Sequence, residues 1–242
     1  MSDETIHLSY HELVTTTHKT LEALGFRRSD SIDAAETVAW QEQHGLNGVE
    51  ELAKSLGFLW RETEAHLEVV YEGGCWRVYN AHGASILSVV GIALDASVAD
   101  VQSYGLAMTR IEACHNRALI GGYFNRGARR GLAAMAYWRN RRDANEVHAL
   151  CVSPELDFPT LRIYQSTPLN GGNHDLVLML SSNLECWPRQ SSDGDSRIVR
   201  FFTPEDMRRA HEASIENGLN VNADAWHKLC RLSSGVLVPE KQ

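Results

Sequence analysis

The sequence predicts a mixed α/β protein with an α+β tendency, in which a helical N-terminal cluster packs on a mixed β-sheet core. Apolar residues repeat at helical spacing in the first third of the chain and alternate with polar residues through the middle. Helix signals return near the C-terminal end. We therefore expect an N-terminal helical unit over residues 1–60, a β-rich core over 61–202, and C-terminal helices over 203–242 that pack back on the first unit.

The helices are predicted from their end signals. Ser9 and Glu12 have the spacing of a capping box, and Gly25 suits the left-handed residue that ends a helix. Similar patterns predict helices from about 31 to 44 and from about 47 to 56. Three further helices are expected: one over about 120–130, one after the cap and proline at 203–204, and one after residue 222.

The strands are predicted from alternation and from the turn residues between them. A pair of glycines at 73–74 indicates the turn of a hairpin. The expected strands cover 67–71, 76–79, 105–111, 132–138, 146–152, 161–165, 176–180 and 198–202.

Composition limits the class of protein. The 242 residues are 43% hydrophobic and 22% charged, which suits a globular domain, and the net charge of −8 disfavours general binding to nucleic acid. The first residues lack a signal peptide pattern, and the longest apolar run, 86–94, is interrupted by Ser88 and Gly91. Five cysteines without a Cys-x-x-Cys pair favour a reduced, cytoplasmic chain with no metal site. We also expect no membrane span, because no stretch approaches the roughly 18 apolar residues that one needs.

Two histidines are candidates for proton transfer. His44 lies at the expected end of a helix, and His115 follows an expected strand, where loops held by a sheet often carry chemistry. Imidazole transfers protons near neutral pH. Taken alone, a histidine of this kind is more often a structural hydrogen-bonding residue, so the catalytic hypothesis requires both rings to meet in one cleft between helices and sheet.

The segments around these histidines resemble a known family. Gln-His-Gly-Leu-Asn-Gly at 43–48, the run 105–115 that ends in Glu-Ala-Cys-His, Gly-Tyr at 122–123 and Trp-Arg-Asn at 138–140 occur in an order similar to the malate/L-lactate dehydrogenase-like family. This is the non-Rossmann type that includes 2,3-diketo-L-gulonate reductase and ureidoglycolate dehydrogenase. The resemblance reaches about residue 140, and the segment 231–239 looks more like a shorter bacterial family related to it.

The resemblance implies a fold, an activity and a cofactor. A protein of this kind would be a homodimer that transfers a hydride between NAD(P)H and a small carboxylate, either a 2-keto or 2-hydroxy acid or a cyclic imino acid. His44 would be the acid/base for the substrate oxygen or nitrogen. His115 would lie beside the substrate and the nicotinamide.

The resemblance also implies binding residues. Arg139 and Asn140 would contact the cofactor, and Asn47 and Tyr123 would contact the substrate. The family's arginine, which binds the substrate carboxylate through two parallel hydrogen bonds, is replaced here by Gly48.

Two alternatives stay open beside the dehydrogenase. The first is a cofactor-free enzyme on the same fold, such as an isomerase, a lyase or a ring-opening hydrolase, in which the two histidines do acid/base work. The second is an inactive relative that serves as a partner subunit or binding module, because fold alone does not determine function.

Overall fold

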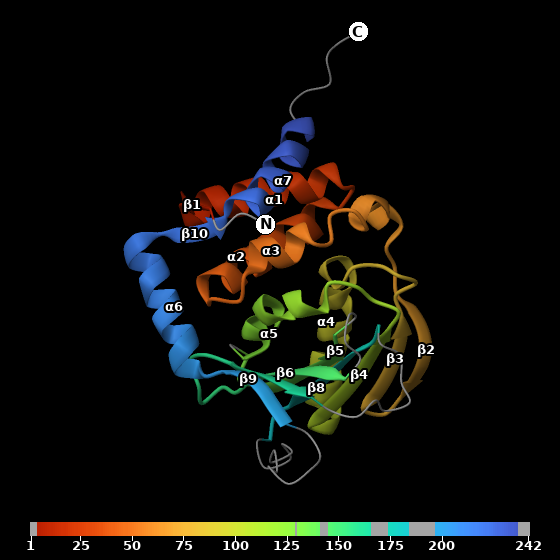
Figure 1. Ribbon diagram of the computed structural model, residues 1–242. Helices are drawn as coiled ribbons and strands as arrows, with labels where there is room; N and C mark the ends of the chain where they lie inside the picture. The colour runs from red at the N-terminus through yellow and green to blue at the C-terminus, as the bar shows by residue number, and fades with distance from the viewer. Residues whose placement is uncertain (1–3, 129, 141–144, 166–173, 184–196, 237–242) are drawn as a thin grey trace.

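The computed structural model describes residues 4–128, 130–140, 145–165, 174–183 and 197–236. A layer of helices lies over a β-sheet, with two helices between them and one along the edge (Figure 1). The helices are α1 (Tyr10–Ala23), α2 (Arg28–Gln43), α3 (Gly48–Ala53), α4 (Ile86–Tyr104), α5 (Gly121–Ala128), α6 (Pro204–Asn217) and α7 (Ala223–Ser233). Short 3-10 turns are η1 (Leu59–Glu64), η2 (Arg117–Ile120) and η4 (Ser234–Val236).

The strands form two sheets in the part of the chain described. They are β1 (Thr5–Leu8), β2 (Glu68–Gly73), β3 (Trp76–Asn80), β4 (Leu106–Glu112), β5 (Ala133–Arg139), β6 (Glu146–Val152), β7 (Thr160–Gln165), β8 (Leu176–Ser181), β9 (Arg197–Phe202) and β10 (Leu219–Asn222). The larger sheet has the order β2-β3-β4-β8-β5-β6-β7-β9, and β1 pairs with β10. Only β3 and β4 run parallel among the paired strands, and α4 makes the crossover between them.

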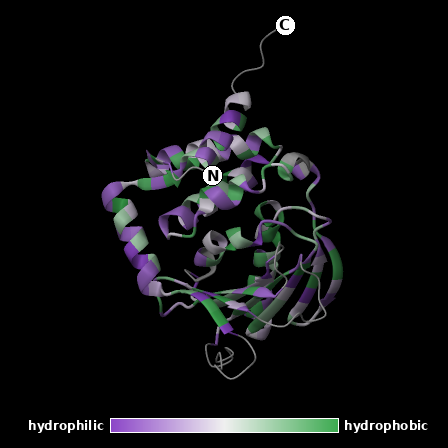
Figure 2. Ribbon diagram, in the orientation of Figure 1, coloured by the Kyte–Doolittle hydropathy of each residue, from purple (hydrophilic) through white to green (hydrophobic). Residues whose placement is uncertain are grey.

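The core lies between the sheet and the helices. Alternate residues of β4 are fully buried, among them Ala107 and Ile111, and Leu178 of β8 is buried beside them. Apolar residues gather on these strands and on α4 in Figure 2. This alternation confirms the strand predictions for the middle of the chain and the mixed α/β fold class.

The helical layer is built from α1, α2, α3 and α7, and α7 packs against α1 and α3. Ser9 accepts a hydrogen bond from the Glu12 amide, and Thr203 forms a full capping box with Asp206. These contacts confirm the predicted helix starts. The helix expected from residue 31 begins at residue 28, and the one expected over 47–56 ends at residue 53.

Helix α4 was not predicted, because only an apolar run was recognised in its first half. It has 19 residues and an 18-residue window with a mean hydropathy of 1.4, so by length and composition alone it could cross a membrane. The apolar segment is therefore longer than the run 86–94 that the sequence indicated. The helix packs on β4 and α2, and its residues Ile86, Val90 and Ala93 are buried in the core, as in a core helix.

Candidate functional site

A polar cavity of about 390 Å³ lies between the connection of α2 to α3 and the strands β5, β6 and β9. Trp138 and Phe202 contribute flat apolar walls. The polar side chains on its wall are Gln41, Asn47, Glu51, Asn116, Arg117, Arg139, Asn140, Glu146, His148 and Arg200. Three predicted binding residues, Asn47, Arg139 and Asn140, therefore share one cavity although they come from two distant segments.

Two buried arginines, Arg117 and Arg139, give the polar cavity positive charge. The Arg117 guanidinium donates to the carbonyl oxygens of Cys114, at 2.8 Å, and of Arg139, at 3.1 Å. Arg117 thereby ties the end of β5 to the loop after β4. Arg200 lies at the exposed edge, with its guanidinium carbon 4.8 Å from the centre of the Phe202 ring, so a ligand can reach it without unfolding.

A histidine and a glutamate that sequence reasoning missed lie on the same wall. His148 Nε2 is 2.7 Å from Glu146 Oε1, and the imidazole stacks on Trp138 with ring centres 5.1 Å apart. Burial lowers the pKa of His148, although the Glu146 carboxylate opposes that shift. The sequence carried a signal for this pair, because Glu146 and His148 lie two residues apart on one strand and therefore point to the same face.

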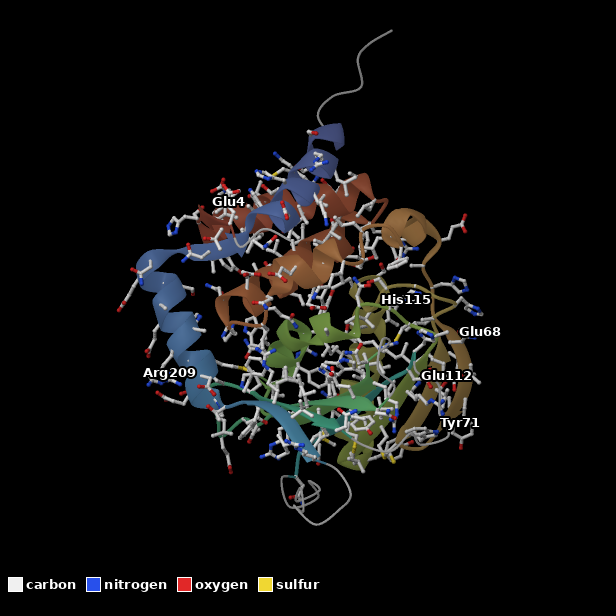
Figure 3. All side chains as sticks on the ribbon, viewed as in Figure 1. Glu4, Glu68, Tyr71, Glu112, His115 and Arg209 are labelled. Carbon is white, nitrogen blue, oxygen red and sulfur yellow. The ribbon has the colours of Figure 1, made fainter. Side chains whose placement is uncertain are left out.

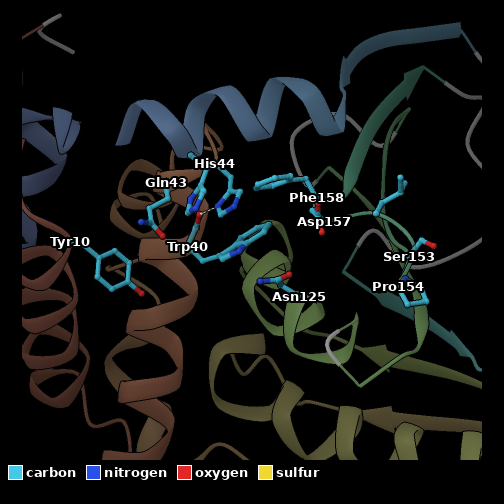
Figure 4. A pocket seen from close by; sticks show the side chains of 11 residues that line it. Tyr10, Trp40, Gln43, His44, Asn125, Ser153, Pro154, Asp157 and Phe158 are labelled. Atoms are coloured by element: carbon cyan, nitrogen blue, oxygen red, sulfur yellow. Dashed lines mark hydrogen bonds between the residues drawn. The ribbon is translucent and has the colours of Figure 1, made fainter. Parts of the chain in front are cut away.

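An aromatic cavity of about 480 Å³ lies on the other side of the α2 end (Figure 4). Four rings meet beside it: Trp40 and His44 from α2 and its C-terminal cap, Phe158 from the loop after β6, and His211 from α6. The His44 ring stacks on Trp40, with centres 4.0 Å apart, and on His211, with centres 4.9 Å apart. Phe158 and His211 were not anticipated, because neither belongs to a sequence motif.

The protonation state of His44 follows from its contacts. Its Nδ1 is 2.5 Å from the Trp40 carbonyl oxygen. Because a carbonyl only accepts, Nδ1 carries the proton and Nε2 is the acceptor. Burial lowers the pKa of His44 to about 4, with a smaller contribution in the same direction from His211, so the ring is neutral at pH 7.

The other two predicted site residues lie elsewhere. The His115 ring is 6.0 Å from the His174 ring and 6.2 Å from the Phe58 ring. In Figure 3, His115 lies on the side of β2 and β3, whereas Arg209 marks α6, the helix that contacts His44, at the opposite edge. His44 lines the aromatic cavity and His115 is not among the described residues that line either cavity, so the expected convergence in one cleft is not found. Four strands separate β4, which precedes His115, from β9, which leads into α6.

Tyr123 is also absent from the described walls of both cavities. Its hydroxyl is buried and donates to the Leu87 carbonyl oxygen at 3.0 Å. This contact links α5 to α4. The structure therefore gives Tyr123 a packing contact and leaves its predicted role in substrate binding without geometric support.

Gly48 is fixed by packing. A Cβ atom at this position would lie 2.2 Å from the Val38 carbonyl oxygen and 3.0 Å from the Gln41 Cβ. The start of α3 thus sits directly on the backbone of α2. An arginine at position 48 would push the two helices apart, so any anchor for a carboxylate must come from another residue.

No group of three histidine, cysteine or acidic side chains with the geometry of a metal site occurs among the described residues. The four cysteines that the structure describes, Cys75, Cys114, Cys151 and Cys230, are free thiols. Burial raises the pKa of the Cys114 thiol to about 12, which makes it an unreactive core residue.

Comparison with known proteins places the fold. No family model and no curated protein matches the sequence. Among solved structures, malate dehydrogenase from Pyrococcus horikoshii OT3 matches with a TM-score of 0.73 and 12% identity, covering 98% of this chain and 97% of that one. Sulfolactate dehydrogenase from Methanocaldococcus jannaschii matches with a TM-score of 0.68 and 9% identity, covering 96% of this chain and 97% of that one.

A third similar structure is delta1-piperideine-2-carboxylate reductase from Pseudomonas syringae pvar. tomato, with a TM-score of 0.63, 12% identity and coverage of 94% of this chain and 100% of that one. The chain therefore has the malate/L-lactate dehydrogenase-like fold. The similarity extends well beyond residue 140, where the sequence resemblance was expected to end, and includes the C-terminal helices.

Proposed function

We propose that this protein is an NAD(P)-dependent oxidoreductase that acts on a small polar substrate. The observation that carries the proposal is the polar cavity, in which Asn47, Arg139 and Asn140 come together on a fold otherwise seen in dehydrogenases and a reductase. The family resemblance had suggested a 2-keto acid, a 2-hydroxy acid or a cyclic imino acid, and all three are small enough for a cavity of this size.

The residues of the polar cavity fit the chemistry of a nucleotide. Guanidinium groups bind phosphate, and Arg117, Arg139 and Arg200 supply three of them. Trp138 and Phe202 offer flat faces for a ring, and Glu51 offers a carboxylate for ribose hydroxyls. When bound, the nicotinamide would supply the hydride acceptor or donor, and the protein's part is to orient the substrate and move its proton.

His44, which lines the aromatic cavity on the other side of the turn after α2 from the polar cavity, is the proposed proton acceptor. Its Nε2 is unprotonated at neutral pH, so it suits removal of a proton from a hydroxyl or amine during oxidation. The titratable groups that share the aromatic cavity with His44 are His211, Asp157 and Tyr10. Because the pKa of His44 is lowered to about 4, the rate of oxidation should be flat above about pH 5 and fall as His44 becomes protonated.

Nucleotide binding tests the proposal. NADH and NADPH titrated into the pure protein should quench tryptophan fluorescence with a dissociation constant between micromolar and sub-millimolar values, since Trp138 lines the site. Arg200→Gln should weaken that binding about 5-fold. Arg197→Gln, an exposed change on the same strand outside the cavity wall, is the matched control. Failure of both nucleotides to bind would contradict the proposal.

A second candidate is favoured by the separation of His44 from the polar cavity. In this alternative, His44 performs acid/base chemistry in the aromatic cavity without a nucleotide. His44→Gln should then abolish turnover, whereas Arg200→Gln should leave it unchanged. In the dehydrogenase both variants lose activity, and only Arg200→Gln loses nucleotide affinity.

A further inference from the structure

The aromatic cavity has a composition that differs from that of the polar cavity. Trp40, His44, Phe158 and His211 come from α2, the loop after β6, and α6, and their rings are held together by stacking. The Phe158 ring centre is 5.6 Å from that of His44 and 5.8 Å from that of His211. A cavity of about 480 Å³ remains beside these rings, so they do not simply fill the core.

The charge on the cavity wall is negative. Asp157 is adjacent to Phe158 and lies at the rim, and neither lysine nor arginine occurs among the described residues of the wall (Figure 4). Aromatic rings present negative faces, which attract cations and repel anions. A neutral His44 adds no positive charge at pH 7, and its Nε2 can accept a hydrogen bond from an N–H group.

The polar cavity favours ligands of the opposite charge, which are anions. Three arginines lie on its wall, and its carboxylates are balanced by them. A carboxylate ligand would therefore bind in the polar cavity, whereas a positively charged ligand would be stabilised in the aromatic one. The two cavities lie on either side of the same turn after α2, because Gln43 and His44 line one and Gly45 and Asn47 line the other.

We propose that the aromatic cavity binds a small organic cation, with an ammonium nitrogen against the Phe158 ring and with Asp157 as its counter-ion. As a statement about binding, this depends only on the cavity. As a statement about the substrate it rests on the proposed function, and it makes the substrate an amine rather than a hydroxy acid. Gly48 agrees with that class, because its packing leaves no room for an arginine that would anchor a carboxylate there.

Choline and its neutral isostere 3,3-dimethyl-1-butanol provide the test, since the two molecules share a shape and differ in charge. Calorimetric titration should show millimolar or tighter binding of choline and at least 5-fold weaker binding of the isostere. Asp157→Asn should weaken choline binding about 3-fold. Glu155→Gln, an exposed carboxylate two residues away that does not line the cavity, should leave it unchanged.

Phe158→Leu separates ring chemistry from simple filling of space. It keeps an apolar side chain but removes the π face, so choline binding should fall about 5-fold while binding of the isostere is retained. Equal affinity for choline and the isostere, displacement of choline by acetate, or no binding of choline would each overturn the inference. If NADH binds and choline does not, the proposed function survives without this inference, and the reverse result would leave the cation site without the nucleotide chemistry.

Discussion

Glu42 and His44 lie two residues apart at the end of α2, and burial shifts their pKa values in opposite directions. Burial raises the pKa of Glu42 to about 7, and it lowers that of His44 to about 4. Glu42 also accepts a hydrogen bond from the Val49 amide at 2.8 Å, which fixes the turn between the two cavities. The turn between the two candidate sites therefore carries two titratable groups whose pKa values are shifted by burial.

The sign of each effect on stability follows from proton linkage. The folded state binds the Glu42 proton more tightly than the unfolded state, so this residue destabilises the fold as pH rises from about 4.5 through about 7. His44 acts in the other direction, because the unfolded state binds its proton more tightly. Its contribution is lost as pH falls from about 6.5 to about 4. Between about pH 4.5 and pH 6.5, the contributions of Glu42 and His44 to the free energy of unfolding therefore change in opposite directions with pH.

Glu42→Gln isolates the first effect. Glutamine keeps an oxygen to accept from the Val49 amide but has no charge to bury. The free energy of unfolding of the variant, relative to the wild type, should rise by about 2 kcal/mol between about pH 5 and pH 8. Urea denaturation at the two pH values measures it, with Glu216→Gln, an exposed change on α6, as control. A difference that does not change with pH would contradict the assignment.

At the scale of elements, α5 approaches α2 through two glycines. A Cβ atom on Gly121 would lie 2.6 Å from Trp40 Cζ3, and one on Gly122 would lie 2.7 Å from the Thr37 Cα. This contact holds Trp40 in place, and Trp40 in turn stacks on His44. The packing of two helices thus positions the ring that the proposed chemistry uses.

Paired alanine substitutions test this packing. Gly122→Ala should destabilise the protein by about 2 kcal/mol, because the backbone of α2 must move. Gly91→Ala, in the exposed interior of α4 with nothing within 4 Å of its Cβ, should stabilise it by about 0.5–1 kcal/mol through helix propensity. Thermal unfolding of both variants gives the sign of each stability change. A change in the same direction for both would refute the close approach of α5 to α2.

Local signals in the sequence predicted most elements because their causes are local. The caps at Ser9 and Thr203 and the alternation along β4 depend on residues a few positions apart. The order of the strands does not depend on such signals. β8 inserts between β4 and β5, and the apolar pattern of a fully paired strand carries no information on its neighbours.

The candidate site was predicted only in part for the same reason. The resemblance assigned Arg139 and Asn140 to the cofactor and Asn47 to the substrate, and all three line the polar cavity. It also suggested that His115 would meet His44, but that expectation depended on long-range packing of α6 and β4. Residues brought in by tertiary packing, such as Phe158, carry no motif of their own.

At the scale of the whole molecule, β1 and β10 connect the start of the chain to the segment between α6 and α7. Thr5 pairs with Asn222 and Leu8 with Leu219 in an antiparallel ladder, and the Ala223 amide donates to the Glu4 carbonyl oxygen. Helix α6 has Met207 as its only fully buried residue. The position of α6 therefore depends on its two ends, because β9 precedes its N-terminus and β10 follows its C-terminus.

Removal of residues 1–8 should loosen α6 while leaving the large sheet intact. With β1 lost, β10 has no partner strand among the described residues, so the end of α6 is freed, and His211 moves away from His44. Hydrogen exchange in α6 should accelerate at least 10-fold while exchange in β5 and β6 changes little, since local opening is governed by local contacts. Unchanged protection of α6 would show that its contacts with α2 suffice to hold the aromatic cavity together, and equal loss in β5 would show that β1 supports the whole fold.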